Sequence, residues 1–493
     1  MRARLVKSDF GQWLNILATV VNDAFGTIAR TAIRGVQSMT RDNSASLSPI
    51  ANAIYLWTIA PLTCGTILAI PVTAFACMFP VMLPLALLMF PVLVFVAMYG
   101  IAWTSYILLA QKDRPSYTML GVPSLTKYIP FLPVTPQRCF KVTKAVLGYI
   151  WSCCSIMSMA KNWFLLYKQH KTRPGSESII YSMPFSRQQL DVYPPTTSTV
   201  DASDVRRNAP VLVLVPDAIV PVTLTSHRKM YLPLATRMQQ LGYCVVVPQI
   251  TYYPADQIRR SVIDLRLALS WVGAHIFHYA GDPSRIYVMG HGLSAELVAL
   301  TLVQEAVVLS QTIKKHRDID DATNHDLTPK SNIIEQETFN KQLEIYAPQV
   351  RLPNIAGVIL LAGHSDVIKS NLNEADLGIE HLSSHRRWTG PQQFQCLLHS
   401  PTHLLMRSKA YLDPTFLPPK FLLIHGGLDK LVPISQAILL RSLLLEIGVK
   451  NTELLAFREM NHFDTFKLFL ASPPLASSKY EIAILKSICS FVA

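Results

Sequence analysis

The sequence predicts an α/β domain with a doubly wound, mostly parallel sheet, preceded by a transmembrane helical hairpin. Two observations support this prediction. An uncharged tract runs from Asn43 to Gln111, and short β-branched runs alternate with amphipathic helical patterns from residue 176 onward. Half of the 493 residues are hydrophobic, and the mean hydropathy is +0.28. Membrane-embedded sequence accounts for such a high value.

The positive charge is concentrated in the first third of the chain. Residues 1–175 carry 16 Lys and Arg against 4 Asp and Glu, whereas residues 176–493 carry 29 against 28. These basic residues flank the uncharged tract and are not interleaved with aromatic or amide side chains that would read bases. We therefore expect a membrane partner and no nucleic-acid partner.

The apolar part of this tract, residues 53–110, is long enough for two membrane crossings of about 20 residues each. Pro80 and Pro84 fit a turn between spans at residues 54–78 and 83–109. A buried helical pair in a soluble core is the alternative, but such a pair would normally show a polar face. The sequence favours an integral membrane hairpin.

Basic residues on both sides of the hairpin place both of its ends in the cytosol by the positive-inside rule. Residues 1–52 form a basic amphipathic segment, and residues 111–175 form a basic juxtamembrane segment with an interfacial helix at 145–167. We expect an integral membrane protein of the endoplasmic reticulum or another endomembrane, with its C-terminal domain in the cytosol.

The cysteine pattern gives no sign of a metal site or a disulfide framework, because the eight cysteines form no C-x-x-C pair. We expect no cofactor and no metal. The adjacent Cys153 and Cys154 are either acylation sites or simply small apolar residues at the membrane interface.

Residues 176–493 alternate between strands and helices, with a polar insertion at 311–348. An apolar stripe predicts a helix from Ile258 to Ile276, and the run at 295–309 predicts another. Buried strands are expected at residues 211–215, 244–247, 286–289, 357–361 and 421–424.

Three motifs in this domain resemble those of α/β-hydrolase carboxylesterases. The stretch YAGDPSRIYVMGHGLSA (279–295) is similar to their Y-G-G-D-P-x-R-I-x-x-x-G-x-S-A-G-A signature, and HGGLDKLVP (425–433) is similar to their H-G-x-x-D-x-x-V-P. Asn461-His462 resembles the loop of the catalytic histidine. The membrane-anchored prenylcysteine methylesterases and the kynurenine-formamidase-like esterases have the most similar patterns. The resemblance implies the α/β-hydrolase fold.

The resemblance also implies a site, and this sequence departs from it at the nucleophile. Asp429 and His462 fall at the positions of the acid and the base, in the chain order of the fold. Gly292 falls at the serine position and has no side chain with which to attack a carbonyl. Ser294 is a candidate substitute, but two residues past the turn it should point away from His462.

The oxyanion hole is also incomplete in the sequence. Leu293 can donate its backbone N–H, but the early turn that supplies the other donor reads Val215-Pro216-Asp217-Ala218. Proline has no N–H, and Asp217 would put negative charge near a developing oxyanion.

We therefore predict a membrane-anchored esterase homologue that is catalytically impaired and that binds an apolar or acyl ligand or scaffolds a partner whose identity is unknown. The alternative is an active carboxylic ester hydrolase on lipid-like, prenyl or acyl esters, with Asp429, His462 and a displaced serine. A domain whose pocket is filled by side chains would be purely structural. An open pocket that reaches His462 would favour binding or catalysis.

Overall fold

The computed structural model describes two compact units. The helical unit comprises residues 1–150 and 374–383, and the sheet unit comprises residues 151–373 and 384–493. The described residues are 65, 69, 73, 83–109, 133–157, 160–172, 176–181, 188–196, 208–218, 228–253, 255–321, 343–390, 392–470 and 479–493.

Eight strands form one sheet in the described part of the chain, in the order β1-β2-β4-β3-β5-β6-β7-β8. Strands β1 and β2 pair antiparallel, as do β2 and β4, and all later pairs are parallel. The strands are β1 (Glu177–Ile180), β2 (Gln189–Tyr193), β3 (Ala209–Val215), β4 (Cys244–Pro248), β5 (Gly281–His291), β6 (Ile355–Leu361), β7 (Lys420–Gly426) and β8 (Asn451–Phe457). The predicted doubly wound, mostly parallel sheet is confirmed.

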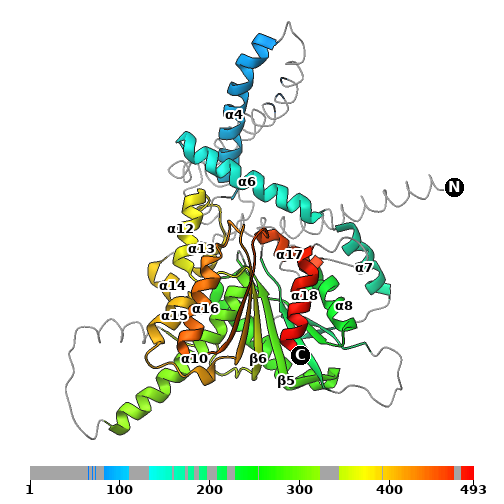
Figure 1. The fold of residues 1–493 in the computed structure, drawn as a ribbon, viewed down its shortest axis with the longest axis vertical. Helices are drawn as coiled ribbons and strands as arrows, with labels where there is room; N and C mark the ends of the chain where they lie inside the picture. Colours follow the sequence, from blue (N-terminus) through cyan, green and yellow to red (C-terminus); the bar gives the residue numbers. More distant parts are fainter. Residues whose placement is uncertain are drawn as a thin grey trace, which may run out of the picture. The chain divides into compact units, whose positions relative to one another are not determined.

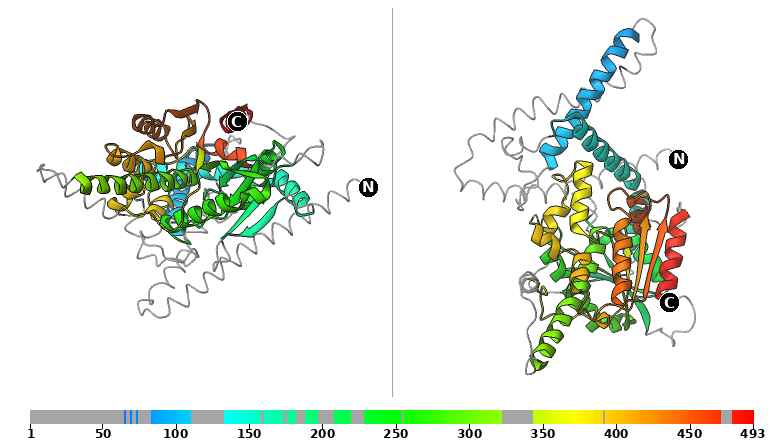
Figure 2. Two further views of the ribbon diagram at one scale, coloured as in Figure 1. Left: turned by 90° about the horizontal axis from the view of Figure 1, so that it is seen from below. Right: turned by 60° about the vertical axis from the view of Figure 1, so that its left-hand side comes forward.

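Helices cover both faces of the sheet (Figure 1). One hydrophobic cluster joins the sheet to α9 (Ile258–His275), α10 (Leu293–Asp321), α15 (Pro401–Ser408) and α16 (Ser435–Ile447). The opposite cluster joins it to α8 (Leu232–Gln240), α17 (His462–Leu470) and α18 (Lys479–Val492). Figure 2 shows α16 and α18 on opposite sides of the C-terminal strands. Burial on both faces explains why the central strands are continuous apolar runs.

The remaining helical elements of the described chain are α4 (Leu83–Leu109), α6 (Pro136–Met157), α7 (Ala160–Thr172), α12 (Val367–Leu377), α13 (His385–Thr389), α14 (Gln393–Leu398) and the short 3₁₀ turns η3 (Arg228–Tyr231), η4 (Ile276–Tyr279) and η5 (Pro414–Phe416). The apolar stripe predicted from Ile258 corresponds to α9 and η4.

Two segments differ from the prediction. The interfacial helix expected at 145–167 is divided between α6 and α7. Helix α6 begins at Pro136, where proline fits the first helical turn. Its first half is basic and contains no apolar run, so the sequence pattern did not indicate a helix there. Helix α10 continues to Asp321, into the insertion predicted at 311–348.

The second predicted membrane span, residues 83–109, coincides with α4. The first, residues 54–78, lies almost wholly outside the described residues, so the hairpin itself stays a prediction. By length and composition, Leu88–Tyr106 in α4 and Leu293–Lys314 in α10 are the described segments that could cross a membrane. The α10 segment is 83% buried and belongs to the core of the sheet unit, whereas the α4 segment is only 17% buried.

Candidate active site

The turn between β5 and α10 has the geometry of a nucleophile elbow. Gly292 separates the strand from the helix with a φ of +55°, a conformation that glycine adopts without steric cost. Its N–H donates to the Leu361 carbonyl at 2.9 Å. An added Cβ at Gly290 would lie 2.7 Å from the backbone of Ser294, so the strand and the helix approach too closely for a side chain there. The sequence therefore folds as its motif predicts, with no side chain at the apex.

The predicted acid and base lie together. Asp429, just after β7, is 6% exposed, and His462, at the start of α17, is 7% exposed. His462 Nδ1 lies 2.8 Å from Asp429 Oδ2, while Asp429 Oδ1 accepts the N–H groups of Leu431 and Val432 at 3.0 and 2.8 Å. This arrangement orients the imidazole as it does in a catalytic triad.

The charges around His462 shift its pKa. Burial alone lowers the pKa, but the charge and hydrogen bond of Asp429 and the charge of Asp217 outweigh burial and raise the pKa above its ordinary value. The imidazolium form is therefore favoured by two carboxylates, and one of them is not part of the expected acid–base pair.

The Asp217 carboxylate occupies the space in which a nucleophile side chain would lie. Asp217 is fully buried, and a Cβ added to Gly292 would lie 2.5 Å from its Oδ2. Its Oδ1 accepts the N–H of Leu293 at 3.1 Å, which is the expected oxyanion donor, and that of Ala218 at 2.8 Å. The sequence predicted a negative charge near the oxyanion position, but not its contact with Gly292.

His291, the residue before the elbow glycine, was missed by sequence reasoning. It is fully buried, and its Nδ1 lies 2.8 Å from Asp217 Oδ2 while its Nε2 lies 2.7 Å from Thr465 Oγ1. Burial lowers the pKa of His291 despite the opposing effect of Asp217. The His291 and His462 rings have centroids 4.9 Å apart. The signal in the sequence was a histidine in the variable position of the elbow motif, beside a missing serine.

Ser294 serves the turn. Its Oγ accepts the N–H of His291 at 2.8 Å and donates to the carbonyl of the same residue at 2.9 Å. The side chain is fully buried. Both hydrogen bonds hold the elbow closed, so the hydroxyl is directed to the backbone and not to His462.

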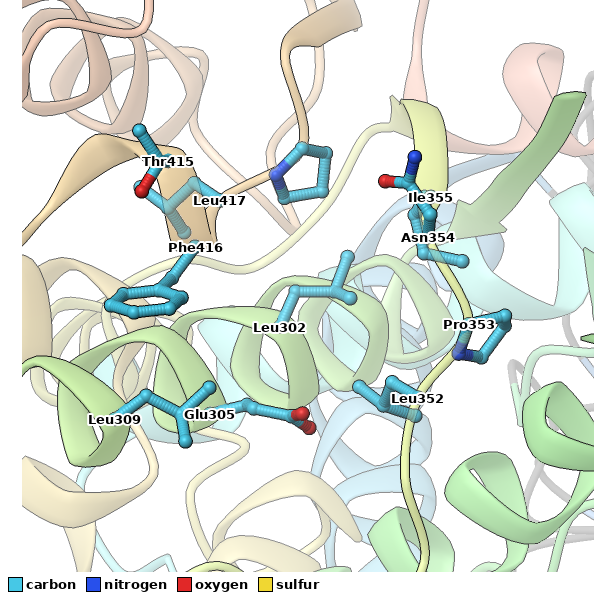
Figure 3. Close-up of a pocket in the computed structure, with 11 residues that line it drawn as sticks. Leu302, Glu305, Leu309, Leu352, Pro353, Asn354, Ile355, Thr415, Phe416 and Leu417 are labelled. Atoms are coloured by element: carbon cyan, nitrogen blue, oxygen red, sulfur yellow. The ribbon is translucent and has the colours of Figure 1, made fainter. Parts of the chain in front are cut away.

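A cavity of about 220 Å³ lies where β6 begins, at the end of the strands opposite to the one that carries Asp429 and His462 (Figure 3). Its lining includes Leu302 and Glu305 of α10 and Phe416. Glu305 forms an ion pair with Arg266. The lining includes neither Asp429 nor His462, so this cavity is not the pocket that we expected beside His462.

A second group of polar side chains could hold a metal ion. Glu296 in the first turn of α10, His364 after β6 and His385 at the start of α13 each offer one ligand atom, and the three atoms lie within 4.8 Å of one another.

Comparisons with known proteins find similarity to esterases. Residues 206–444 match the BD-FAE family. Over 94 residues the chain is 34% identical to the esterase LipQ of Mycobacterium tuberculosis, a match that covers 19% of this chain and 22% of that protein. The chain belongs to the α/β-hydrolase esterase superfamily.

A second curated protein matches over a short stretch, and a solved structure aligns over a longer one. The chain is 37% identical over 65 residues to the probable isoprenylcysteine alpha-carbonyl methylesterase ICMEL1 of Arabidopsis thaliana, covering 13% of this chain and 14% of that protein. The chain thus matches about a fifth or less of the length of these two curated relatives. The apo form of Thermogutta terrifontis esterase 2 aligns with a TM-score of 0.39 at 16% identity, over 65% of this chain and 97% of that one.

Proposed function

We propose that this protein is a membrane-anchored member of the carboxylesterase type that is catalytically impaired and acts by binding an apolar or acyl ligand or by scaffolding a partner. The observation that carries the proposal is the Asp217 carboxylate, which lies against Gly292 and accepts the Leu293 N–H. One buried side chain thus fills both the place of the nucleophile and a position meant for an oxyanion.

The expected effect on catalysis is large. Loss of the nucleophile from a serine–histidine–aspartate site removes about 10⁶ in turnover. The backbone donors that remain would give residual catalysis, but here Leu293 already donates to a carboxylate. A negative charge at that position opposes the oxyanion that ester hydrolysis must form.

The ligand class of the proposal rests on the relatives. One of them is named as a probable isoprenylcysteine alpha-carbonyl methylesterase, and an isoprenyl group is apolar. A homologue anchored in a membrane would meet such amphipathic molecules at the interface. We therefore assign prenyl or acyl lipids as the ligand class.

Membrane anchoring is supported by apolar side chains exposed along α4. Leu88 is 69% exposed, and Val92 and Phe95 are also exposed. Such a surface on one helix is unfavourable in water and favourable in a lipid bilayer. Helix α6 presents exposed Phe140, Leu147 and Ile150 together with its lysines, a composition that suits the interface.

The second candidate function is an active carboxylic ester hydrolase that uses another nucleophile. The retained pair of Asp429 and His462 favours it, because a buried carboxylate that orients an imidazole is the arrangement that a general base requires. The bonds of Ser294 to the His291 backbone argue against that serine as the nucleophile.

Hydrolysis of p-nitrophenyl butyrate by the full chain in detergent micelles separates the two candidates. We expect His462→Ala to hydrolyse the ester as slowly as the wild type, with His278→Ala as the control for background reaction of an exposed histidine. A loss of about 10³-fold or more in His462→Ala alone would establish the active enzyme and contradict the proposal.

A further inference from the structure

Glu296 is the starting point, because it is a charged side chain with 0% exposure. Its Oε2 lies 2.8 Å from His385 Nε2. Its Oε1 is buried and has no hydrogen-bond partner among the residues that the structure describes. A buried carboxylate oxygen without a partner is costly unless a cation or donor satisfies it.

Two imidazoles lie beside this carboxylate. The rings of His364 and His385 are stacked, with centroids 4.5 Å apart and planes inclined by 20°. His364 Nδ1 lies 2.8 Å from Ser370 Oγ, and that oxygen also accepts the amide of Gln436 at 2.8 Å. Metal-binding histidines commonly have one ring nitrogen held by such an outer partner while the other binds the ion.

We propose that Glu296, His364 and His385 form a binding site for a divalent transition-metal ion of the zinc type. Two imidazoles and one carboxylate are a frequent ligand set for zinc with an open fourth position. A tetrahedral zinc ion keeps its ligand atoms about 3.4 Å apart. Since the three ligand atoms lie within 4.8 Å of one another, movements of about 1 Å would bring them onto one ion.

The structural alternative is a plain ion pair between Glu296 and His385. That pair uses one carboxylate oxygen and leaves Oε1 without a partner, and it gives no role to the stacked His364. A metal ion accounts for all three side chains. Sequence analysis found no metal signal because the ligands come from three separate segments, in α10, after β6 and in α13.

The test is zinc binding by the full chain, purified without a histidine tag, stripped with a chelator and followed by equilibrium dialysis. We expect one tightly bound equivalent in the wild type. His364→Ala and the isosteric Glu296→Gln should weaken binding by more than about 100-fold, since loss of an outer partner alone costs 10–100-fold. His278→Ala, at an exposed histidine outside the cluster, should bind as the wild type does. No binding by the wild type, or equal binding by His364→Ala, would overturn the proposal.

A second measurement needs no variant and covers the case in which a substitution prevents folding. Zinc should slow the modification of His364 by diethyl pyrocarbonate in the wild type, while exposed His278 should react at an unchanged rate, as read by peptide mass spectrometry. If zinc leaves the rate at His364 unchanged, the ion does not bind there and the site is refuted.

Discussion

Gly292→Ser restores the residue that the elbow motif requires, yet we expect it to fail as a single change. The new Cβ would lie 2.5 Å from Asp217 Oδ2, far inside van der Waals contact. A serine at a φ of +55° also carries backbone strain of about 1–3 kcal/mol, and the overlap adds about 1–3 kcal/mol. The single variant should therefore be destabilised and unreactive.

Asp217→Ala in the same chain should relieve the overlap. Alone, this substitution leaves the N–H groups of Leu293 and Ala218 without their acceptor and His291 Nδ1 without its partner, at a cost of about 1–3 kcal/mol for each buried group left unpaired. In the double variant the serine no longer overlaps with the Asp217 carboxylate. The destabilisation of the double variant should therefore be smaller than the sum of the two single destabilisations by about 1–3 kcal/mol.

The assay is a double-mutant cycle of denaturant unfolding, combined with reaction of each variant with a fluorophosphonate. We expect the double variant to be more stable than the sum of the single changes predicts and to react at the introduced serine, while Gly292→Ser alone stays unlabelled. Additive stabilities, together with equal labelling of the single and double variants, would show that Asp217 does not occupy this position.

Three further predictions concern the same turn, the base and the anchor. Asp429→Asn should lower the pKa of His462, which a histidine NMR titration would measure. The pKa of His462 in the folded protein lies above the ordinary 6.5. The stability that this pair contributes is therefore complete below pH 6.5 and declines as the pH rises through the folded pKa. Ser294→Ala should lower the free energy of unfolding by about 1 kcal/mol, since it removes the bonds to His291, without changing ester hydrolysis. The full chain should remain in the membrane pellet after alkaline carbonate extraction, because α4 exposes its apolar residues; release into the supernatant would contradict integral anchoring.

The sequence predicted the sheet well because each central strand is buried on both faces and therefore consists of an uninterrupted apolar run. Two elements were predicted less well. Strand β8 (Asn451–Phe457) has one buried residue and so forms no apolar run, and α10 extends past its apolar stripe to Asp321. A helix whose last turns are polar gives no apolar signal at its end.

In the site, too, residues in local motifs were predicted and a contact between distant segments was not. Asp429 and His462 were found because each lies in a local motif beside a strand end. The contact of Asp217 with Gly292 joins residues at the ends of β3 and β5 that are far apart in sequence but adjacent in the sheet, where β3 and β5 pair. The sequence indicated that the negative charge of Asp217 is unfavourable for an oxyanion. Only the pairing of β3 with β5 shows that this carboxylate lies where the nucleophile side chain would be.

The most direct test of the central claim is the reaction of the wild-type full chain with a fluorophosphonate, followed by intact-mass measurement and peptide mapping. The double variant Asp217→Ala/Gly292→Ser serves as the positive control. We expect no adduct on the wild type. A stoichiometric adduct on Ser294, or on another serine whose reaction is lost in His462→Ala, would show a working nucleophile and contradict it.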